Sequence, residues 1–167
     1  MGLPVSLPDN LPTVVLHRII DQEELYASVN ACCLYSLGTE LPFTKGGQGF
    51  MHLDEAWSHQ EDWGIWSIGP RANIRFQATS KRHSDFLLTI SFHVFIPPQH
   101  GYTDVSLLVN GTPLEQWWFF SFYSCMQKQV IVPDEVVTIY EHTIVTFVID
   151  EPISQHAAGL SLDDREL

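Results

Sequence analysis

The feature that most constrains the fold is the dipeptide Asn110-Gly111, which lies inside the stretch TDVSLLVNGTPLEQWWFFSFY, residues 103–123. Two runs rich in β-branched and aromatic residues flank it. A type I′ turn needs positive φ at both central residues, and Asn followed by Gly is the pair that tolerates this best. The stretch therefore predicts an antiparallel β-hairpin.

Further strand patterns surround this hairpin. In RANIRFQATS, residues 71–80, apolar residues alternate with Arg, Asn and Gln, as on a strand with one buried face. Residues 50–55 also alternate, and DFLLTISFHVFIP, KQVIVP and HTIVTFVIDEP read as further strands. About eight strands after residue 45, spaced as in sandwiches and barrels, predict an all-β fold: an antiparallel, jelly-roll-like β-sandwich.

The N-terminal part of the chain has a different texture. Prolines recur through its first twelve residues and favour an extended lead-in. Residues 13–20 fit either a strand or the start of a helix, and Asp21 with Glu24 resembles a capping box that would begin a short helix. We therefore expect an N-terminal extension, residues 1–44, with a short helical or irregular segment, packed on a sandwich formed by residues 45–167.

The charge balance limits the classes of partner. The 167 residues contain 8 Lys and Arg against 20 Asp and Glu, for a formal net charge of −12. A field of that sign repels phosphate backbones and anionic lipid head groups, so nucleic acid and membrane surfaces are poor partners. Neutral ligands feel this field only weakly and stay open.

The expected compartment is the cytoplasm. The N-terminus lacks the basic start and apolar run of a secretory signal, and no apolar stretch reaches the roughly 18 residues of a membrane span. Adjacent Cys32 and Cys33, with Cys125, do not form a disulfide framework or a zinc spacing, and we interpret them as small core residues.

Tryptophan is concentrated in WSHQEDWGIWSIGPRA, residues 57–72, which holds three of the five in the chain. On an extended strand, Trp63 and Trp66 would point to opposite faces, and so would the adjacent Trp117 and Trp118, of which one should be core. An outward indole beside carboxylates and amides is the usual equipment for sugar recognition. The competing interpretation is that all five indoles are core or edge-covering residues, because tryptophan is usually highly buried.

A longer stretch, LPFTKGGQGFMHLDEAWSHQEDWGIWSIGPRANIRF at residues 41–76, resembles a segment found in bacterial polysaccharide-biosynthesis proteins, often beside a glycosyltransferase domain. The features that carry the resemblance are a Gly-rich stretch, the WSxxExWGxWS motif that follows it, a turn and an apolar strand. The resemblance extends through VNG at 109–111 to the ending IDEPISQHAAGLSLDDREL, with departures at Ala56 and Gln155. It implies a non-catalytic β-sandwich accessory domain concerned with glycan or with the assembly that makes it.

These observations together define a candidate ligand face without catalytic residues. The first choices are the aromatic and charged residues of the motif, and the second choices are the paired tryptophans: Trp57, Glu61, Trp63, Trp66 and Arg71, then Trp117 and Trp118. The expected partner is a glycan, or a glycosyltransferase or synthase subunit. An alternative from another class is a structural or protein-interaction subunit, including a homo-oligomer, whose interface the same aromatics would form.

Enzymatic alternatives rest on weaker patterns. His52 and Asp54 would share a strand face and could supply half of an iron site. His156 would complete that site, and Arg165 would bind the carboxylate of a substrate, as in an oxygenase. The same residues together with His59 would fit a cupin-like site. The chain has eight histidines, so such a pair arises easily by chance.

A glycosidase would need a pair of carboxyl groups across a cleft. Glu61 with Asp54 or Asp62 is the candidate pair, although adjacent loop acids are more often solvated. No cofactor is expected. A structural calcium ion held by Asp150, Asp163 and Asp164 is the alternative to a solvated acidic surface.

Overall fold

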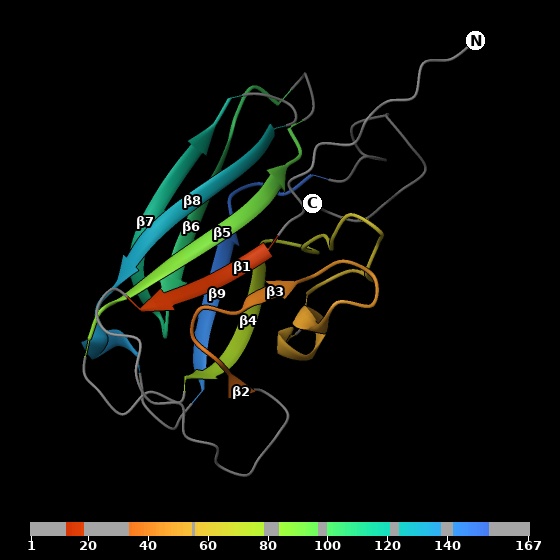
Figure 1. Ribbon diagram of the computed structural model, residues 1–167. Helices are drawn as coiled ribbons and strands as arrows, with labels where there is room; N and C mark the ends of the chain where they lie inside the picture. The colour runs from red at the N-terminus through yellow and green to blue at the C-terminus, as the bar shows by residue number, and fades with distance from the viewer. Residues whose placement is uncertain are drawn as a thin grey trace.

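The computed structural model describes residues 13–18, 34–54, 56–78, 84–96, 100–120, 124–137 and 142–153 (Figure 1). These residues form nine strands and two short 3-10 turns: β1 (Thr13–Arg18), β2 (Leu34–Tyr35), β3 (Glu40–Pro42), η1 (Gln48–His52), β4 (Arg71–Ala78), β5 (Phe86–Val94), β6 (Thr103–Val109), β7 (Thr112–Phe119), β8 (Ser124–Val132), η2 (Asp134–Val136) and β9 (Thr143–Ile149). Within these ranges, no helix is long and apolar enough to cross a membrane.

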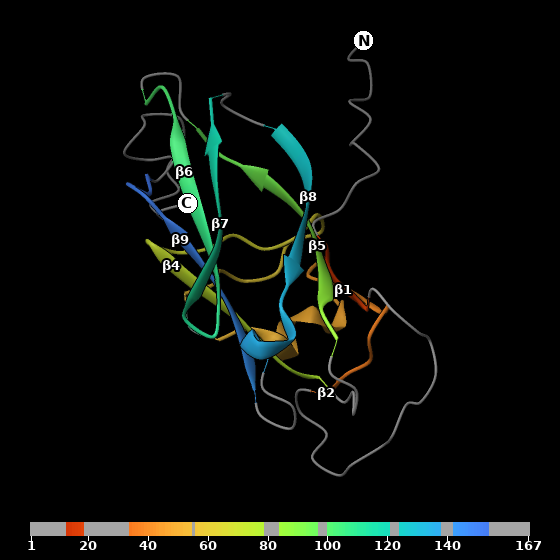
Figure 2. The ribbon, with the colours of Figure 1, turned by 90° about the vertical axis from the view of Figure 1, so that its left-hand side faces the viewer.

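The strands form two sheets that lie face to face. The first sheet has the order β3-β1-β5-β8, and the second has the order β2-β4-β9-β6-β7. Figure 2, which views the molecule at right angles to Figure 1, shows the two layers side by side. All pairs are antiparallel except the short β2–β4 pair. The prediction of an all-β antiparallel sandwich is confirmed.

The chain alternates between the layers in the manner of a jelly roll. Successive described strands lie in opposite sheets, except at the β6–β7 hairpin, and β9 returns to lie between β4 and β6. β1 occupies an interior place in the first sheet, between β3 and β5. Residues 13–18 and 40–42 of the expected N-terminal extension therefore supply strands of the sandwich itself.

The core lies between the sheets and follows the alternation of the sequence. On β4, Ala72, Ile74 and Phe76 are buried, as their pattern predicts, and the first sheet contributes Phe86 and Leu88. Inward faces of β6, β7, β8 and β9 complete the same cluster. Burying this apolar surface is the main force that holds the two layers together.

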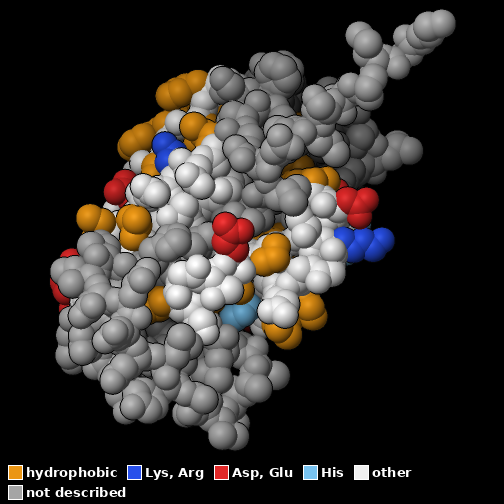
Figure 3. All heavy atoms as spheres, in the orientation of Figure 1, with side chains coloured by type: hydrophobic (Ala, Val, Ile, Leu, Met, Phe, Trp, Pro, Cys, Tyr) orange, Lys and Arg blue, Asp and Glu red, His pale blue; other side chains and the backbone are white. Residues whose placement is uncertain are grey.

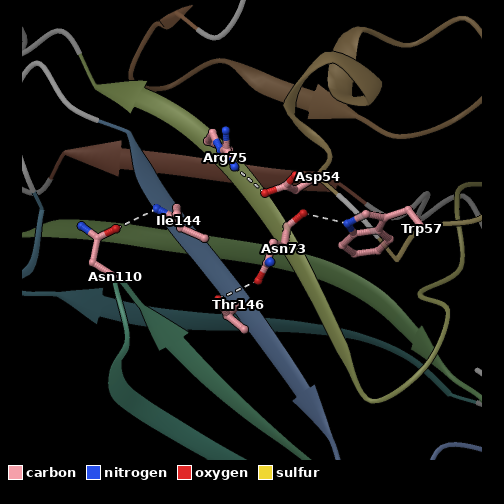
Figure 4. Close-up of polar contacts among 7 residues, drawn as sticks. All are labelled: Asp54, Trp57, Asn73, Arg75, Asn110, Ile144 and Thr146. Atoms are coloured by element: carbon pink, nitrogen blue, oxygen red, sulfur yellow. Dashed lines mark hydrogen bonds and ion pairs between the residues drawn. The ribbon is translucent and has the colours of Figure 1, made fainter.

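The hairpin turn is the one that Asn110-Gly111 predicts. Asn110 has φ of 48° and Gly111 has φ of 81°, so both central residues adopt positive φ. The Asn110 side chain also reaches outside the hairpin: its Oδ1 accepts a hydrogen bond from the Ile144 amide at 2.8 Å (Figure 4), and its Nδ2 donates to the Val136 carbonyl at 2.7 Å. The residue thus connects the turn to β9 and to η2.

Several local predictions differ from the structure. Residues 50–54, the described part of the alternating stretch 50–55, do not form a strand, because the chain enters the 3-10 turn η1. Gly49 in this turn lies so close to the backbone that a Cβ would stand 2.7 Å from the Pro42 carbonyl oxygen. Six strands, rather than about eight, follow residue 45 in the described part of the chain. The expected helix at Asp21 and Glu24, with Cys32 and Cys33, lies outside the described residues.

Candidate functional site

The segment that follows η1 covers the open edge of β4. Leu53 forms a bridge with Ile74, and the Asp54 amide donates to the Asn73 carbonyl at 3.2 Å. The Trp57 Nε1–H donates to the same Asn73 carbonyl at 2.7 Å (Figure 4). An uncovered strand edge would present free backbone groups for pairing with another chain, so this segment protects the second sheet.

Trp57 therefore stabilises the fold through contacts with the sheet. Its indole N–H is engaged by the backbone, and its ring packs edge-on against Phe147, with ring centroids 6.4 Å apart. The side chain is half-buried and packs against the core cluster. Little of its ring system is available for a ligand outside the sandwich.

Trp63 and Trp66 do not lie on opposite faces of a strand, and that prediction is wrong. The chain turns back at Gly64, where Glu61 and Gly64 exchange backbone hydrogen bonds, and the two rings meet at a centroid distance of 4.6 Å. Trp66 is only 9% exposed, whereas Trp63 is half-buried. The Trp63 Nε1–H donates to the Glu61 carboxylate at 2.6 Å, and the Trp63 ring contacts His93.

A cavity of about 130 Å³ lies between the sheets behind this segment. Trp57 and Trp66 line it from the connecting segment, and Trp117 lines it from β7. Ile90 and Phe92 of β5 form part of the opposite wall. Three of the candidate tryptophans thus face the interior of the sandwich rather than a shared outer surface.

The outer face of the second sheet carries a different aromatic group. Trp118 is 54% exposed, while its neighbour Trp117 is 8% exposed, so the prediction that one of the two is core is confirmed. Beyond the end of β7, Phe120 is 74% exposed and contacts the exposed ring of Tyr102, with centroids 6.2 Å apart. We call Tyr102, Trp118 and Phe120 the aromatic platform.

Polar groups lie beside this platform. Asp104 pairs with Trp118 across the β6–β7 ladder and so shares its face, and Gln116 Nε2 donates to the Asp104 carboxylate at 3.3 Å. In the next row, Arg71 of β4 is opposite Val148, Val148 is opposite Ser106, and Ser106 is opposite Gln116. Because neighbouring strands are about 4.8 Å apart, the backbone at Arg71 lies ~14 Å from that at Gln116 on this face.

The predicted site residues are thus divided among three places. Trp57, Trp66 and Trp117 line the cavity, Glu61 and Trp63 form a pair in the connecting segment, and Arg71 and Trp118 share the outer face of the second sheet. Sequence reasoning did not identify the remaining platform residues or the polar groups beside them. The signal for Phe120 was its position two residues after Trp118, which places both on one side of an extended chain.

His52 and Asp54 both have partners on β4. His52 is 4% exposed, and its Nδ1 forms a hydrogen bond with the Arg75 carbonyl at 3.0 Å. Burial lowers the pKa of His52 below its usual value, and the bond to the carbonyl opposes that shift. Asp54 forms an ion pair with the Arg75 guanidinium at 2.5 Å (Figure 4). The expected shared strand face is absent, because His52 ends a 3-10 turn.

The described residues contain no group of three His, Cys, Asp or Glu side chains that could hold a metal ion. His156, Arg165, Asp163 and Asp164, which the iron and calcium alternatives invoked, lie outside the described residues. Asp150 is described, and its amide donates to the Asp104 carbonyl at 3.1 Å.

Apolar side chains are visible on the molecular surface as well as in the core. Figure 3 shows some of them along the side on which β7 and β8 lie in Figure 1, and others on the opposite side of the view. Among the side chains of the first sheet whose burial is described, Ile131 on β8 is the large apolar one that is exposed, at 58%. Comparison of the chain with family models, curated proteins and solved structures gave no match.

Proposed function

We propose that this protein is a non-catalytic, glycan-binding accessory module of bacterial polysaccharide biosynthesis, and that its ligand face is the outer face of the second sheet. The observation that carries the proposal is Trp118, an indole 54% exposed whose cross-strand partner is the carboxylate residue Asp104. A buried tryptophan serves packing, whereas an exposed one beside oriented polar groups is equipped to bind.

The chemistry of the aromatic platform suits a pyranose ring. The apolar face of the sugar stacks on the flat indole, and its hydroxyl groups bind carboxylate and amide groups near the ring plane. The hydrogen bond from Gln116 to Asp104 holds that carboxylate in place before a ligand arrives. A preorganised acceptor loses less side-chain freedom on binding, which favours affinity.

The same face has room for more than one sugar unit. Arg71 lies three strands away from Gln116 in one cross-strand row, and the exposed side of this row carries Ser106 and Val148. A linked glycan lying across the strands would reach from the platform to the Arg71 guanidinium, which donates hydrogen bonds to hydroxyl or carboxylate oxygens.

The resemblance of residues 41–76 to segments of polysaccharide-biosynthesis proteins supports the biological setting. In this structure Trp57 covers the β4 edge and, with Trp66, lines the cavity, so these two tryptophans of the motif support the fold behind the ligand face. We therefore assign binding to Trp118 and its neighbours, and a structural role to Trp57 and Trp66.

The test is a glycan array followed by titration of any hit with the Trp118→Ala variant. Loss of a central aromatic anchor should cost about 2 kcal/mol, or roughly 30-fold in Kd. Ile131→Ala is the matched control, because it removes an exposed apolar side chain of similar exposure from the other sheet. Equal affinity of Trp118→Ala and the unaltered protein for the same glycan would refute the assignment.

A second candidate function is protein interaction through the same platform. The specific observation is that Phe120, which follows the edge strand β7, contacts Tyr102, which precedes the neighbouring strand β6, so that exposed aromatic surface continues beyond Trp118. Aromatic residues of this kind are enriched at interfaces. Size measurements over a range of concentrations separate the two: an interface predicts association that Trp118→Ala abolishes, whereas glycan binding predicts a concentration-independent size.

A further inference from the structure

The cavity between the sheets has a lining of distinct character. Thirteen of the seventeen described residues that line it are apolar, and seven of these are aromatic: Phe43, Phe92, Phe95, Phe147, Trp57, Trp66 and Trp117. We propose that this cavity is a second binding site, which takes a neutral hydrocarbon group such as the end of an acyl or isoprenoid chain. It lies on the opposite side of the second sheet from the aromatic platform, so it is independent of the proposed glycan site.

The size of the cavity sets the size of the ligand. At about 130 Å³ it is comparable to the engineered cavity of about 150 Å³ in another protein that stays dry and binds benzene. It therefore takes one small ring or the last few carbons of a chain. Ser67, His93 and Ile149, which are half-buried, are among the residues that line it, so the lining extends to the molecular surface.

Three polar groups of the lining are already engaged by the protein. Thr103 Oγ1 donates to the Asp150 carbonyl at 3.2 Å, and Ser91 Oγ accepts a hydrogen bond from Gln127 at 3.3 Å. The Trp57 N–H is held by the Asn73 carbonyl. Water needs two to four polar partners to remain in a cavity, and a sugar needs partners for each hydroxyl. These contacts favour an apolar occupant over either.

The charges of the site favour a neutral group. Among the described residues that line the cavity there is no Lys, Arg, Asp or Glu, and the single titratable side chain is that of His93, whose ring packs against Trp63. An anionic head group at this position would find no Lys or Arg among the described lining residues, and the net charge of −12 would repel it. A neutral hydrocarbon pays neither penalty.

The three indoles of the lining provide the measurement, because a bromine atom in contact with an indole quenches its fluorescence. The full chain carrying Trp118→Phe, which removes the exposed indole, is titrated with 1-bromohexane and, in a parallel arm, with bromocyclohexane. We expect quenching that saturates while part of the emission remains. The arm with the lower half-quenching concentration tells whether a chain end or a ring is preferred.

Two variants fill the cavity from opposite sheets and provide the controls. Val105→Phe on β6 and Val94→Leu on β5 each add side-chain volume at a lining position, and each should raise the half-quenching concentration about tenfold. A small polar quencher, 2-bromoethanol, should give only linear, unsaturated quenching. Linear quenching by all three bromides, or saturation unchanged in whichever filled variant folds, would overturn the proposal. Neither result bears on glycan binding by Trp118.

Discussion

The unfilled space between the sheets lowers the free energy of unfolding, and adding a single methylene group at its wall tests this effect. Residual cavities destabilise a protein by about 24 cal/mol per Å³, so a volume of 130 Å³ corresponds to about 3 kcal/mol. Val105 lines the cavity from β6 and is 9% exposed. Val105→Ile adds one methylene group at this wall, and burying a methylene contributes about 0.8 kcal/mol. We therefore expect Val105→Ile to raise the free energy of unfolding by about 1 kcal/mol.

The assay is equilibrium unfolding in urea, with the slope of the transition compared between variants. An increase of this size should move the midpoint upward by about 0.3–1 M, with the slope unchanged. Val145→Ile is the matched control, because Val145 is 1% exposed on β9 and is not among the residues lining the cavity. There the added methylene overpacks the core, and we expect destabilisation of about 1–3 kcal/mol. A loss of stability in both variants would show that the cavity has no room and would refute the reasoning.

Three further changes test other contacts. Asn110→Ala removes the side-chain bonds to Ile144 and Val136 and places alanine at positive φ, so the free energy of unfolding measured in urea should fall by about 2–3 kcal/mol; Asn110→Gly, which tolerates that φ, should lose less. Because burial lowers the pKa of His52, this histidine is protonated at a higher pH in the unfolded state than in the folded state. Its contribution to the free energy of unfolding should therefore be constant above about pH 6.5 and decline as the pH falls below that value, by at most about 1.4 kcal/mol per pH unit. His52→Asn should flatten that decline in urea titrations repeated at several pH values. The Asp54–Arg75 pair is more than a third exposed at Arg75, so Asp54→Asn should cost less than about 1 kcal/mol in thermal unfolding, and added salt should narrow the difference.

The part of the fold that sequence predicts best is the part governed by local chemistry. Asn110-Gly111 identifies its turn because positive φ is a property of those two residues, and the buried side of β4 follows from strict alternation. Which of Trp117 and Trp118 is buried and which is exposed was not predictable in the same way. A regular two-residue hairpin would pair Asp104 with Trp117, but the register shifts at Leu107/Leu108 and pairs it with Trp118.

That shift decides which indole is outside. Leu114 is the extra residue on β7, and without it the faces of the later β7 residues would be exchanged, because neighbouring residues on a strand point in opposite directions. The residue types along this hairpin do not indicate a bulge, so sequence reasoning could say only that one of the two tryptophans is core.

The motif segment shows a different limit of sequence reasoning. Trp63 and Trp66 meet because the chain turns at Gly64, and Trp57 lies against β4 because a backbone carbonyl of Asn73 accepts its N–H. These positions depend on contacts with strands that follow later in the chain. Spacing alone treats the segment as extended, and so it separated two rings that are in contact.

The interior place of β1 makes assembly of the first sheet depend on the earliest described part of the chain. β3 and β5 have no ladder with each other; each is joined to β1. A protein shortened past residue 18 would therefore keep two unsatisfied strand edges facing a gap, which another extended chain could enter. During synthesis, the strand at 13–18 must await residues 86–90 before it finds its longer partner, so the first sheet cannot close around β1 until more than half of the chain has been made.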